Sequence, residues 1–274
     1  MGNADIKGKW ALITGASRGV GRQIALGLAG HGCNVVLHSR ELSHTESLAA
    51  ELVAMGVEVR QVAGELSDQS QVDSMIHSAL EQTPGIDIVY NNAAVMTPFR
   101  NDWLNFPADD FRKSFEVNTI SLIRICLALI PGMRERQWGR IINVTSGVRD
   151  QPEMSAYAAS KAAIDKFVRD SANTLKKDGI LINLLDPGWL RTDLGGPNAP
   201  NAVESVLPGA LVPALLDDDT TGKWFNAQDY AQNHAQDHSN SGSDCGSESD
   251  SCSSDCGSES DSCGAESTGC GSCN

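Results

Sequence analysis

The residues with the clearest capacity for chemistry are Tyr157 and Lys161, which stand four positions apart in the segment Tyr-Ala-Ala-Ser-Lys. On a helix this spacing places the phenol and the ammonium on the same face. A free phenol has a pKa of about 10, so it exchanges protons poorly at neutral pH. The neighbouring ammonium is expected to lower the pKa of Tyr157 toward the working range. The pair is therefore a candidate for proton transfer, although a packed tyrosine beside a solvated lysine is the default interpretation of this spacing alone.

A glycine-rich turn follows the first apolar segment of the chain, residues 10–14. Glycines in such a turn let backbone N–H groups approach a pyrophosphate, and the helix that begins there directs its positive end at the anion. A turn that merely packs a helix on a strand would have the same spacing, but its place between a strand and a helix favours dinucleotide binding. The candidate residues are Gly15, Ser17, Arg18, Gly19, Val20 and Gly21.

Two arginines indicate which dinucleotide is preferred. Sites for NAD usually have an acidic residue at the end of the second strand, to bind the ribose hydroxyls. This chain has His38-Ser39-Arg40 there, and Arg18 lies within the glycine turn. Either arginine alone could be a solvated surface residue, but two guanidinium groups without the acid suit a 2′-phosphate. The sequence predicts NADP(H) in preference to NAD(H).

The elements that position these residues alternate between short apolar strands and amphipathic helices. This alternation predicts a parallel sheet covered on both faces, in a doubly wound α/β fold that binds ligands at the carboxyl ends of its strands. Strands are expected over 10–14, 34–38, 57–62, 86–90, 140–144 and 180–185, and helices over 21–31, 45–55, 72–80, 111–134 and 155–177.

Charge and cysteine content divide the chain into residues 1–230, a single catalytic domain, and residues 231–274. The last 36 residues hold six of the eight cysteines, 13 serines and seven acidic residues, with no Lys or Arg. Such a composition cannot bury a core, so this tail is expected to be disordered. Its Cys-x-x-Cys, residues 270–273, leaves metal binding by the tail as an alternative; no metal site is expected in the body.

The overall balance of charge and hydropathy excludes other classes of partner. The net charge of −14 argues against a nucleic-acid partner. The longest apolar run, residues 120–133, is interrupted by Arg124 and is too short to span a bilayer. The first ten residues contain no apolar signal-peptide core. We expect a cytoplasmic protein that acts on a small molecule, without a membrane partner.

Five motifs in order resemble the short-chain dehydrogenase/reductase family over residues 5–226. They are the G-x-x-x-G-x-G turn, Asn91-Asn92-Ala93-Ala94, Thr145-Ser146, Tyr157-x-x-x-Lys161, and the segment Asp186-Pro187-Gly188-Trp189-Leu190-Arg191-Thr192. The resemblance implies a Rossmann-like fold and an oxidoreductase that transfers hydride between a nicotinamide and a carbonyl or alcohol.

The resemblance also implies roles for individual residues. Asn118, Ser146, Tyr157 and Lys161 match the catalytic residues, with Ser146 orienting the carbonyl and Asn118 holding a water of the proton relay. Thr145 is a rival to Ser146, since the spacing to Tyr157 is shorter than usual. Asn118 could equally be an amide bonded to the backbone. The implied cofactor contacts beyond the glycine turn and Arg40 are Glu65, Leu66, Asn92, Ala93, Tyr157, Lys161, Pro187, Gly188, Leu190 and Thr192.

The substrate pocket is expected to be apolar, which suits a 3-oxoacyl thioester or another apolar ketone. Its expected lining is Met96, Phe99, Val148, Met154 and Trp189. An NADP(H)-binding protein without turnover remains the alternative function. A homodimer through residues 120–131 and 157–175 is expected. A tetramer is left open, because the chain lacks the family's usual final segment.

Overall fold

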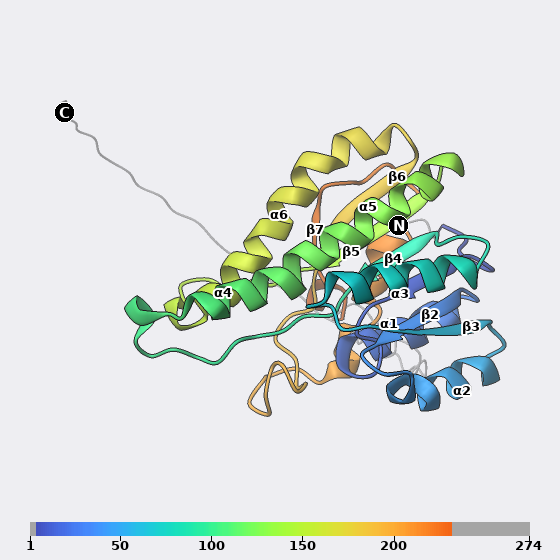
Figure 1. The fold of residues 1–274 in the computed structure, drawn as a ribbon. Coiled ribbons are helices and arrows are strands. Elements are labelled where there is room, and N and C mark those ends of the chain that lie inside the picture. Colours follow the sequence, from blue (N-terminus) through green and yellow to red (C-terminus); the bar gives the residue numbers. More distant parts are fainter. Residues whose placement is uncertain (1–3, 232–274) are drawn as a thin grey trace, which may run out of the picture.

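The computed structural model describes residues 4–231, so the cysteine-rich tail and its possible metal site lie outside the described residues. All seven strands pair in parallel in one sheet, in the order β3-β2-β1-β4-β5-β6-β7. The predicted Rossmann-like, doubly wound sheet is confirmed (Figure 1). The strands are β1 (Trp10–Ile13), β2 (Asn34–Ser39), β3 (Val59–Ala63), β4 (Ile88–Asn91), β5 (Gly139–Val144), β6 (Ile180–Asp186) and β7 (Trp224–Asn226).

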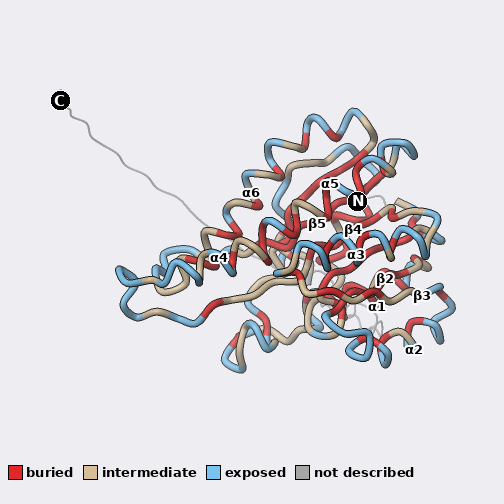
Figure 2. The backbone as a smooth tube through the Cα atoms, in the orientation of Figure 1, coloured by how far each residue is buried: buried red, intermediate tan, exposed pale blue. Residues whose placement is uncertain are grey.

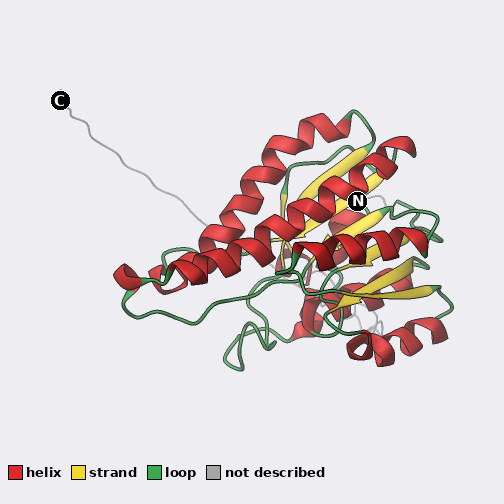
Figure 3. Cartoon of the chain, viewed as in Figure 1, coloured by secondary structure: helices red, strands yellow, loops and turns green. Residues whose placement is uncertain are grey.

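Helices flank both faces of this sheet (Figure 3). Buried residues of α1 and α2 pack on one face, and those of α3, α5 and α6 pack on the other. The α-helices are α1 (Gly19–Gly30), α2 (Glu46–Ala54), α3 (Gln69–Glu81), α4 (Ala108–Phe115), α5 (Ser121–Glu135), α6 (Ser155–Lys176) and α7 (Gln228–Ala231).

Strand β1 shows why the strands read as continuous apolar runs. Ala11 and Ile13 belong to the core on the α1 side, whereas Trp10 and Leu12 belong to the core on the α3 side. Successive side chains of a strand point to opposite faces, so a strand covered on both faces must be apolar at every position. Figure 2 shows the resulting band of buried backbone through the sheet.

The expected helix over 111–134 is longer and contains an irregular turn. It runs from α4 through a π-helical turn, η3 (Glu116–Ile120), into α5. The combined helix, Ala108–Glu135, is long and apolar enough to cross a membrane by length and composition, but half of its most apolar stretch is buried inside the fold. This burial is typical of a core helix. The π-helical turn places Asn118 opposite α6, as described below.

Candidate active site

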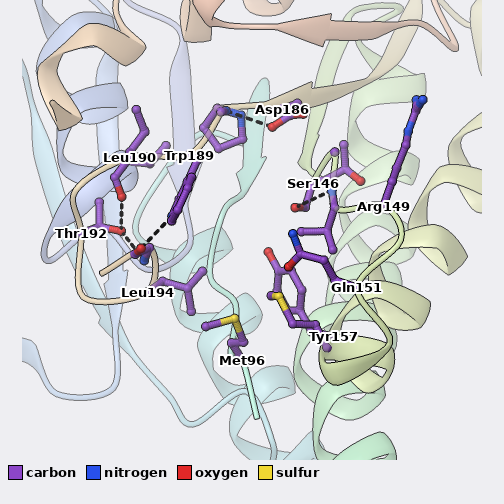
Figure 4. Close-up of a pocket in the computed structure, with 18 of the residues that line it drawn as sticks. Met96, Ser146, Arg149, Gln151, Tyr157, Asp186, Trp189, Leu190, Thr192 and Leu194 are labelled. Atoms are coloured by element: carbon purple, nitrogen blue, oxygen red, sulfur yellow. Dashed lines mark hydrogen bonds between the residues drawn. The ribbon is translucent and has the colours of Figure 1, made fainter. Parts of the chain in front are cut away.

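A pocket of about 640 Å³ opens beyond the carboxyl ends of β5 and β6 (Figure 4). Trp189 and Leu194 form one side of it, and Ser146, Gln151 and Tyr157 form the other. The five residues expected to contact substrate, Met96, Phe99, Val148, Met154 and Trp189, all line this pocket. The structure therefore brings the predicted phenol and the predicted apolar wall together.

Tyr157 lies in the first turn of α6 and its side chain points into the pocket. Only 6% of the residue is exposed. Burial raises the pKa of Tyr157, the nearby Ser146 hydroxyl lowers it, and the charge of Asp186 raises it further. This raised pKa is that of the protein without a nucleotide, so the expected lowering of the Tyr157 pKa by Lys161 together with a positive nicotinamide ring stays a prediction.

Lys161 follows one turn later on α6 and is buried beneath the pocket. Its Nζ lies 5.8 Å from the centre of the Tyr157 ring and donates a 2.7 Å hydrogen bond to the carbonyl of Val144. Burial lowers the pKa of Lys161 to about 8, and the charge of Asp165 partly opposes this shift. A lysine with this pKa can gain and lose a proton near neutral pH.

The two candidate hydroxyls at the end of β5 have different surroundings. Thr145 is buried, and its Oγ1 donates a 2.7 Å hydrogen bond to Asp165 on α6. Ser146 lies beside the Tyr157 hydroxyl and its Oγ accepts a 3.4 Å hydrogen bond from the backbone N–H of Val148. Thr145 is therefore engaged with the helix, whereas Ser146 faces the phenol.

Asn118 lies in the π-helical turn with its side chain fully buried. Its Oδ1 accepts from the backbone N–H of Val95 at 2.8 Å, and its Nδ2 donates to the carbonyl of Val95 and to Ser160 Oγ. The amide thus fastens the chain after β4 to the turn of α6 that carries Lys161. Both amide hydrogens are used in these bonds, so the side chain has none to offer a water.

The glycine turn has the close packing that a dinucleotide site requires. Gly15 has a φ of +66°, which favours glycine, and its backbone N–H donates to His38 Nδ1 at 3.4 Å. A Cβ on Gly21 would overlap the carbonyl oxygen of Gly15. Helix α1 begins at Gly19, with Val20 lining the pocket, and no side chain in the described part of the chain caps its N-terminus. The uncapped N–H groups and the glycine cradle fit a pyrophosphate.

The residues directly after β4 support the glycine turn through hydrogen bonds. Thr14 Oγ1 accepts hydrogen bonds of 3.0 Å from the backbone N–H groups of Asn92 and Ala93. The Asn92 amide donates to the carbonyls of Thr14 and Gly15. Asn92 therefore supports the turn through its side chain, and Ala93 passes close to Gly15.

Five of the expected cofactor contacts follow β1, β2 and β3, whose carboxyl ends share one edge of the sheet: Ser17, Arg18, Arg40, Glu65 and Leu66. Arg40 is exposed, whereas Arg18 Nε pairs with Asp193 at 3.1 Å. Glu65 Oε1 accepts from the backbone N–H of Ser67, and the Leu66 side chain is buried in the core. Ser17 lies in the glycine turn between these groups and α1. Arg40 is thus the more available cation of the two arginines.

The segment after β6 forms the wall nearest the glycine turn. Pro187, Gly188, Leu190 and Thr192 line the pocket, and a Cβ on Gly19 would lie 3.5 Å from the Thr192 side chain. Trp189 Nε1 donates to the carbonyl of Gly195 at 2.7 Å, which closes the loop while the ring remains 59% exposed. This loop connects the expected cofactor contacts to the apolar substrate wall.

Several polar residues of the site had no role assigned to them from the sequence. Asp186 and Gln151 line the pocket, Asp165 holds Thr145, and His38 contacts the glycine turn. Asp165 lies four residues after Lys161, so helical spacing alone could have indicated it. Among residues 4–231, no group of three or more His, Cys, Asp or Glu side chains is placed to hold a metal ion.

Comparisons with known proteins agree with this geometry. Residues 9–202 match the family model for short chain dehydrogenase. The chain is 32% identical over 228 residues to a 3-oxoacyl-[acyl-carrier-protein] reductase of Pseudomonas aeruginosa, covering 82% of this chain and 88% of that protein.

Solved structures with bound nicotinamide cofactors share the fold. A 3-oxoacyl (acyl-carrier-protein) reductase from Agrobacterium tumefaciens C58 with NADP bound superposes with a TM-score of 0.75 at 28% identity, covering 81% of this chain and 93% of that chain. A NAD+-bound xylitol dehydrogenase gives a TM-score of 0.72 at 25% identity, covering 81% and 98%. This chain belongs to the short-chain dehydrogenase/reductase family and is an NAD(P)-dependent oxidoreductase.

Proposed function

We propose that this protein is an NADP(H)-dependent reductase of uncharged, apolar carbonyl compounds, with Tyr157 as the proton donor. The observation that carries the proposal is the meeting of Tyr157 and Ser146 with the 187–192 segment in one pocket whose remaining lining is largely apolar. A reductase needs these parts together: a proton donor, a group that orients the carbonyl, and a wall for the nicotinamide.

Each side chain then has a defined task. When bound, the nicotinamide supplies hydride to the carbonyl carbon. Ser146 orients the carbonyl oxygen toward Tyr157, and Tyr157 gives its proton to that oxygen as the alkoxide forms. Lys161, anchored on the carbonyl of Val144, stabilises the phenolate that remains and returns a proton to it. Asn118 positions the turn of α6 that carries Lys161 through its bonds to Val95 and Ser160.

Preference for NADP(H) is supported by two arginines, Arg18 and Arg40, and by the lack of an acidic residue at the end of β2. Arg40 stands after β2, where an NAD site usually has a carboxylate. Arg18 lies in the glycine turn and would exchange its exposed partner Asp193 for a phosphate. Relatives of known fold include both NADP-bound and NAD+-bound proteins, so the preference depends on these residues of this chain.

The substrate class is argued from the wall of the pocket. Met96, Met154 and Leu194 are flexible or branched apolar side chains, and Trp189 offers an aromatic face. Such a wall suits an alkyl or aryl ketone, or the acyl chain of a 3-oxoacyl thioester, the substrate class named for the Pseudomonas aeruginosa relative. The lining includes the charged side chains of Arg149 and Asp186, but most of it is apolar, so a charged substrate would lose hydration along this wall.

The experiment begins with nucleotide binding and continues with turnover. Tryptophan quenching on titration with NADPH and, separately, NADH measures both affinities, and we expect NADPH to bind more tightly. A panel of acetoacetyl and longer 3-oxoacyl thioesters, aryl ketones and polyol-derived ketones then tests reduction at 340 nm. We expect Tyr157→Phe to bind NADPH normally and to lose turnover by roughly 100-fold or more.

The alternative is an NADP(H)-binding protein without turnover. It predicts tight NADPH binding and equal, background rates for wild type and Tyr157→Phe on every carbonyl. Failure of both nucleotides to bind would reject the reductase and this alternative together.

We also propose that the protein forms a homodimer through α5 and α6. Ile120, the last residue of η3, and Leu127 of α5 have exposed apolar side chains. Light scattering after gel filtration is expected to give twice the mass of one chain, and a single-chain mass at micromolar concentration would contradict it.

A further inference from the structure

Asp186, the last residue of β6, places a carboxylate in the wall of the pocket directly before Pro187 and Gly188. The backbone N–H of Gly188 donates a 2.9 Å hydrogen bond to its Oδ1. A Cβ on Gly147 would lie only 2.7 Å from Oδ2, so the carboxylate packs closely over this glycine in the loop after β5. The side chain therefore has a fixed position between the loop that carries Ser146 and the loop that carries Leu190.

Within residues 4–231, the groups that stabilise the charge of this carboxylate are neutral backbone N–H groups. Burial raises the pKa of Asp186, the backbone N–H groups of Gly188 and Gly147 partly offset this, and the charge of Asp229 adds to the rise. In residues 4–231, no Lys, Arg or His side chain forms an ion pair with it. The negative charge of Asp186 also acts on the catalytic phenol, because it contributes to the raised pKa of Tyr157. A poorly hydrated negative charge thus stands at the reacting end of the site.

A positive charge arriving beside Asp186 would therefore be stabilised more than a neutral group. The nicotinamide ring is neutral when reduced and positive when oxidised, and the 187–192 segment is the wall to which the proposed function assigns it. We propose that Asp186 sets the relative affinity for the two forms, by stabilising the oxidised nucleotide against the reduced one. This inference rests on the proposed NADP(H) site and concerns a positioning residue, which acts on the ring through its charge.

The same charge would favour reduction of the carbonyl once both reactants are bound. When bound, the nicotinamide would supply the hydride that forms the C–H bond of the alcohol and would itself be left positive, while Tyr157 would give the proton of the new O–H group. The fixed carboxylate of Asp186 would then lower the energy of the product side and of a transition state that resembles it.

The test compares affinities for NADP+ and NADPH in wild type, Asp186→Asn and Asp186→Ser. Asparagine removes the charge at nearly constant size, and serine keeps a small acceptor for Gly188 if the amide disturbs the loop. Both dissociation constants are measured by tryptophan quenching or calorimetry, with thermal melting to verify folding. Asp217→Asn is the matched control, because Asp217 is an exposed carboxylate that does not line the pocket.

We expect both Asp186 variants to weaken NADP+ by roughly 3- to 10-fold relative to NADPH, and the control to leave the ratio unchanged. An unchanged ratio in the variants, or an equal loss of both nucleotides, would overturn the inference and leave the proposed function standing. Wild type that binds neither nucleotide would instead reject the proposed function itself, so the two failures are distinguishable.

Discussion

Lys161 Nζ donates a 2.7 Å hydrogen bond to the main-chain carbonyl of Val144, the last residue of β5. This bond links Lys161 of α6 to the end of β5, which is followed directly by Thr145 and Ser146. The phenol of Tyr157 and the hydroxyl of Ser146 are thereby held in a common frame. Preorganisation of this kind reduces the cost of aligning groups when a substrate binds.

Burial of this lysine is expected to cost stability. Its pKa falls from 10.5 to about 8 on folding, so between these values the unfolded chain holds more protons than the folded one. The contribution of Lys161 to the free energy of unfolding therefore becomes more favourable as the pH rises from about 8 to 10.5. Below pH 8 the full cost of burying the charged lysine applies. We expect Lys161→Met to raise Tm at pH 7 by roughly 3 °C, with a difference that shrinks toward pH 10.

Differential scanning calorimetry of both proteins across this pH range checks the prediction. Lys166→Met is the control, because Lys166 pairs with Asp170 on the solvent side of the same helix. A lower Tm for Lys161→Met at pH 7 would mean that the bond to Val144 outweighs the burial cost.

Asp165 is expected to control the alkaline limit of turnover. Its charge raises the pKa of Lys161, so Asp165→Asn should lower that pKa below about 8. The amide can still accept the bond from Thr145, which preserves the local packing. We expect the rate to decline at lower pH than in wild type, measured as kcat against pH. Asp170→Asn, on the exposed side of α6, should leave the pH dependence of kcat unchanged. If the alkaline decline of kcat does not shift in Asp165→Asn, Lys161 is not the group whose titration causes it.

Two glycines of α1, Gly21 and Gly30, allow a paired test of the close packing in the glycine turn. A Cβ at position 21 would overlap the carbonyl oxygen of Gly15, whereas one at position 30 meets no atom within 4 Å. Gly21→Ala should force the turn open, lower Tm and weaken NADPH binding by roughly 10-fold or more. Gly30→Ala should retain wild-type affinity. Nucleotide titration and thermal melting measure both effects, and equal behaviour of the two variants would contradict the assigned cradle.

The exposed arginine after β2 should determine cofactor choice. Arg40→Ala removes a guanidinium from the expected 2′-phosphate position and should weaken NADPH by roughly 10-fold, with NADH affinity unchanged. Arg18→Ala should have a smaller effect, since Arg18 must first leave Asp193. Titrations at two salt concentrations test this, because a phosphate contact weakens with ionic strength. Arg112→Ala, an exposed site on α4, serves as the control.

Much of the fold could be predicted from local patterns. The central strand β1 is an unbroken apolar run, Trp10, Ala11, Leu12 and Ile13, because both faces of the sheet are covered there, whereas the edge strand β3 contains Arg60 and Gln61. The glycine turn and the Tyr157–Lys161 pair are also local, since spacing along one turn or one helix fixes their geometry. Helix α3 begins at Gln69, earlier than its apolar spacing indicated, because Asp68 caps its first turn.

Other features depended on contacts between distant segments. Thr145 and Ser146 are adjacent in the sequence, and only the position of Asp165, 20 residues later, engages one and leaves the other facing Tyr157. The pairing of Arg18 with Asp193 likewise joins the glycine turn to the loop after β6. No spacing rule gives such contacts, because loop paths decide them.

The sequence by itself determined which chemical groups are present, their order and the parallel sheet that collects them at one edge. Only the tertiary structure decided the pKa values of those groups. Burial raises the pKa of Tyr157, lowers that of Lys161 and leaves Asp186 with neutral partners. A pKa depends on the water and charges that surround a group in three dimensions, and a linear pattern contains neither.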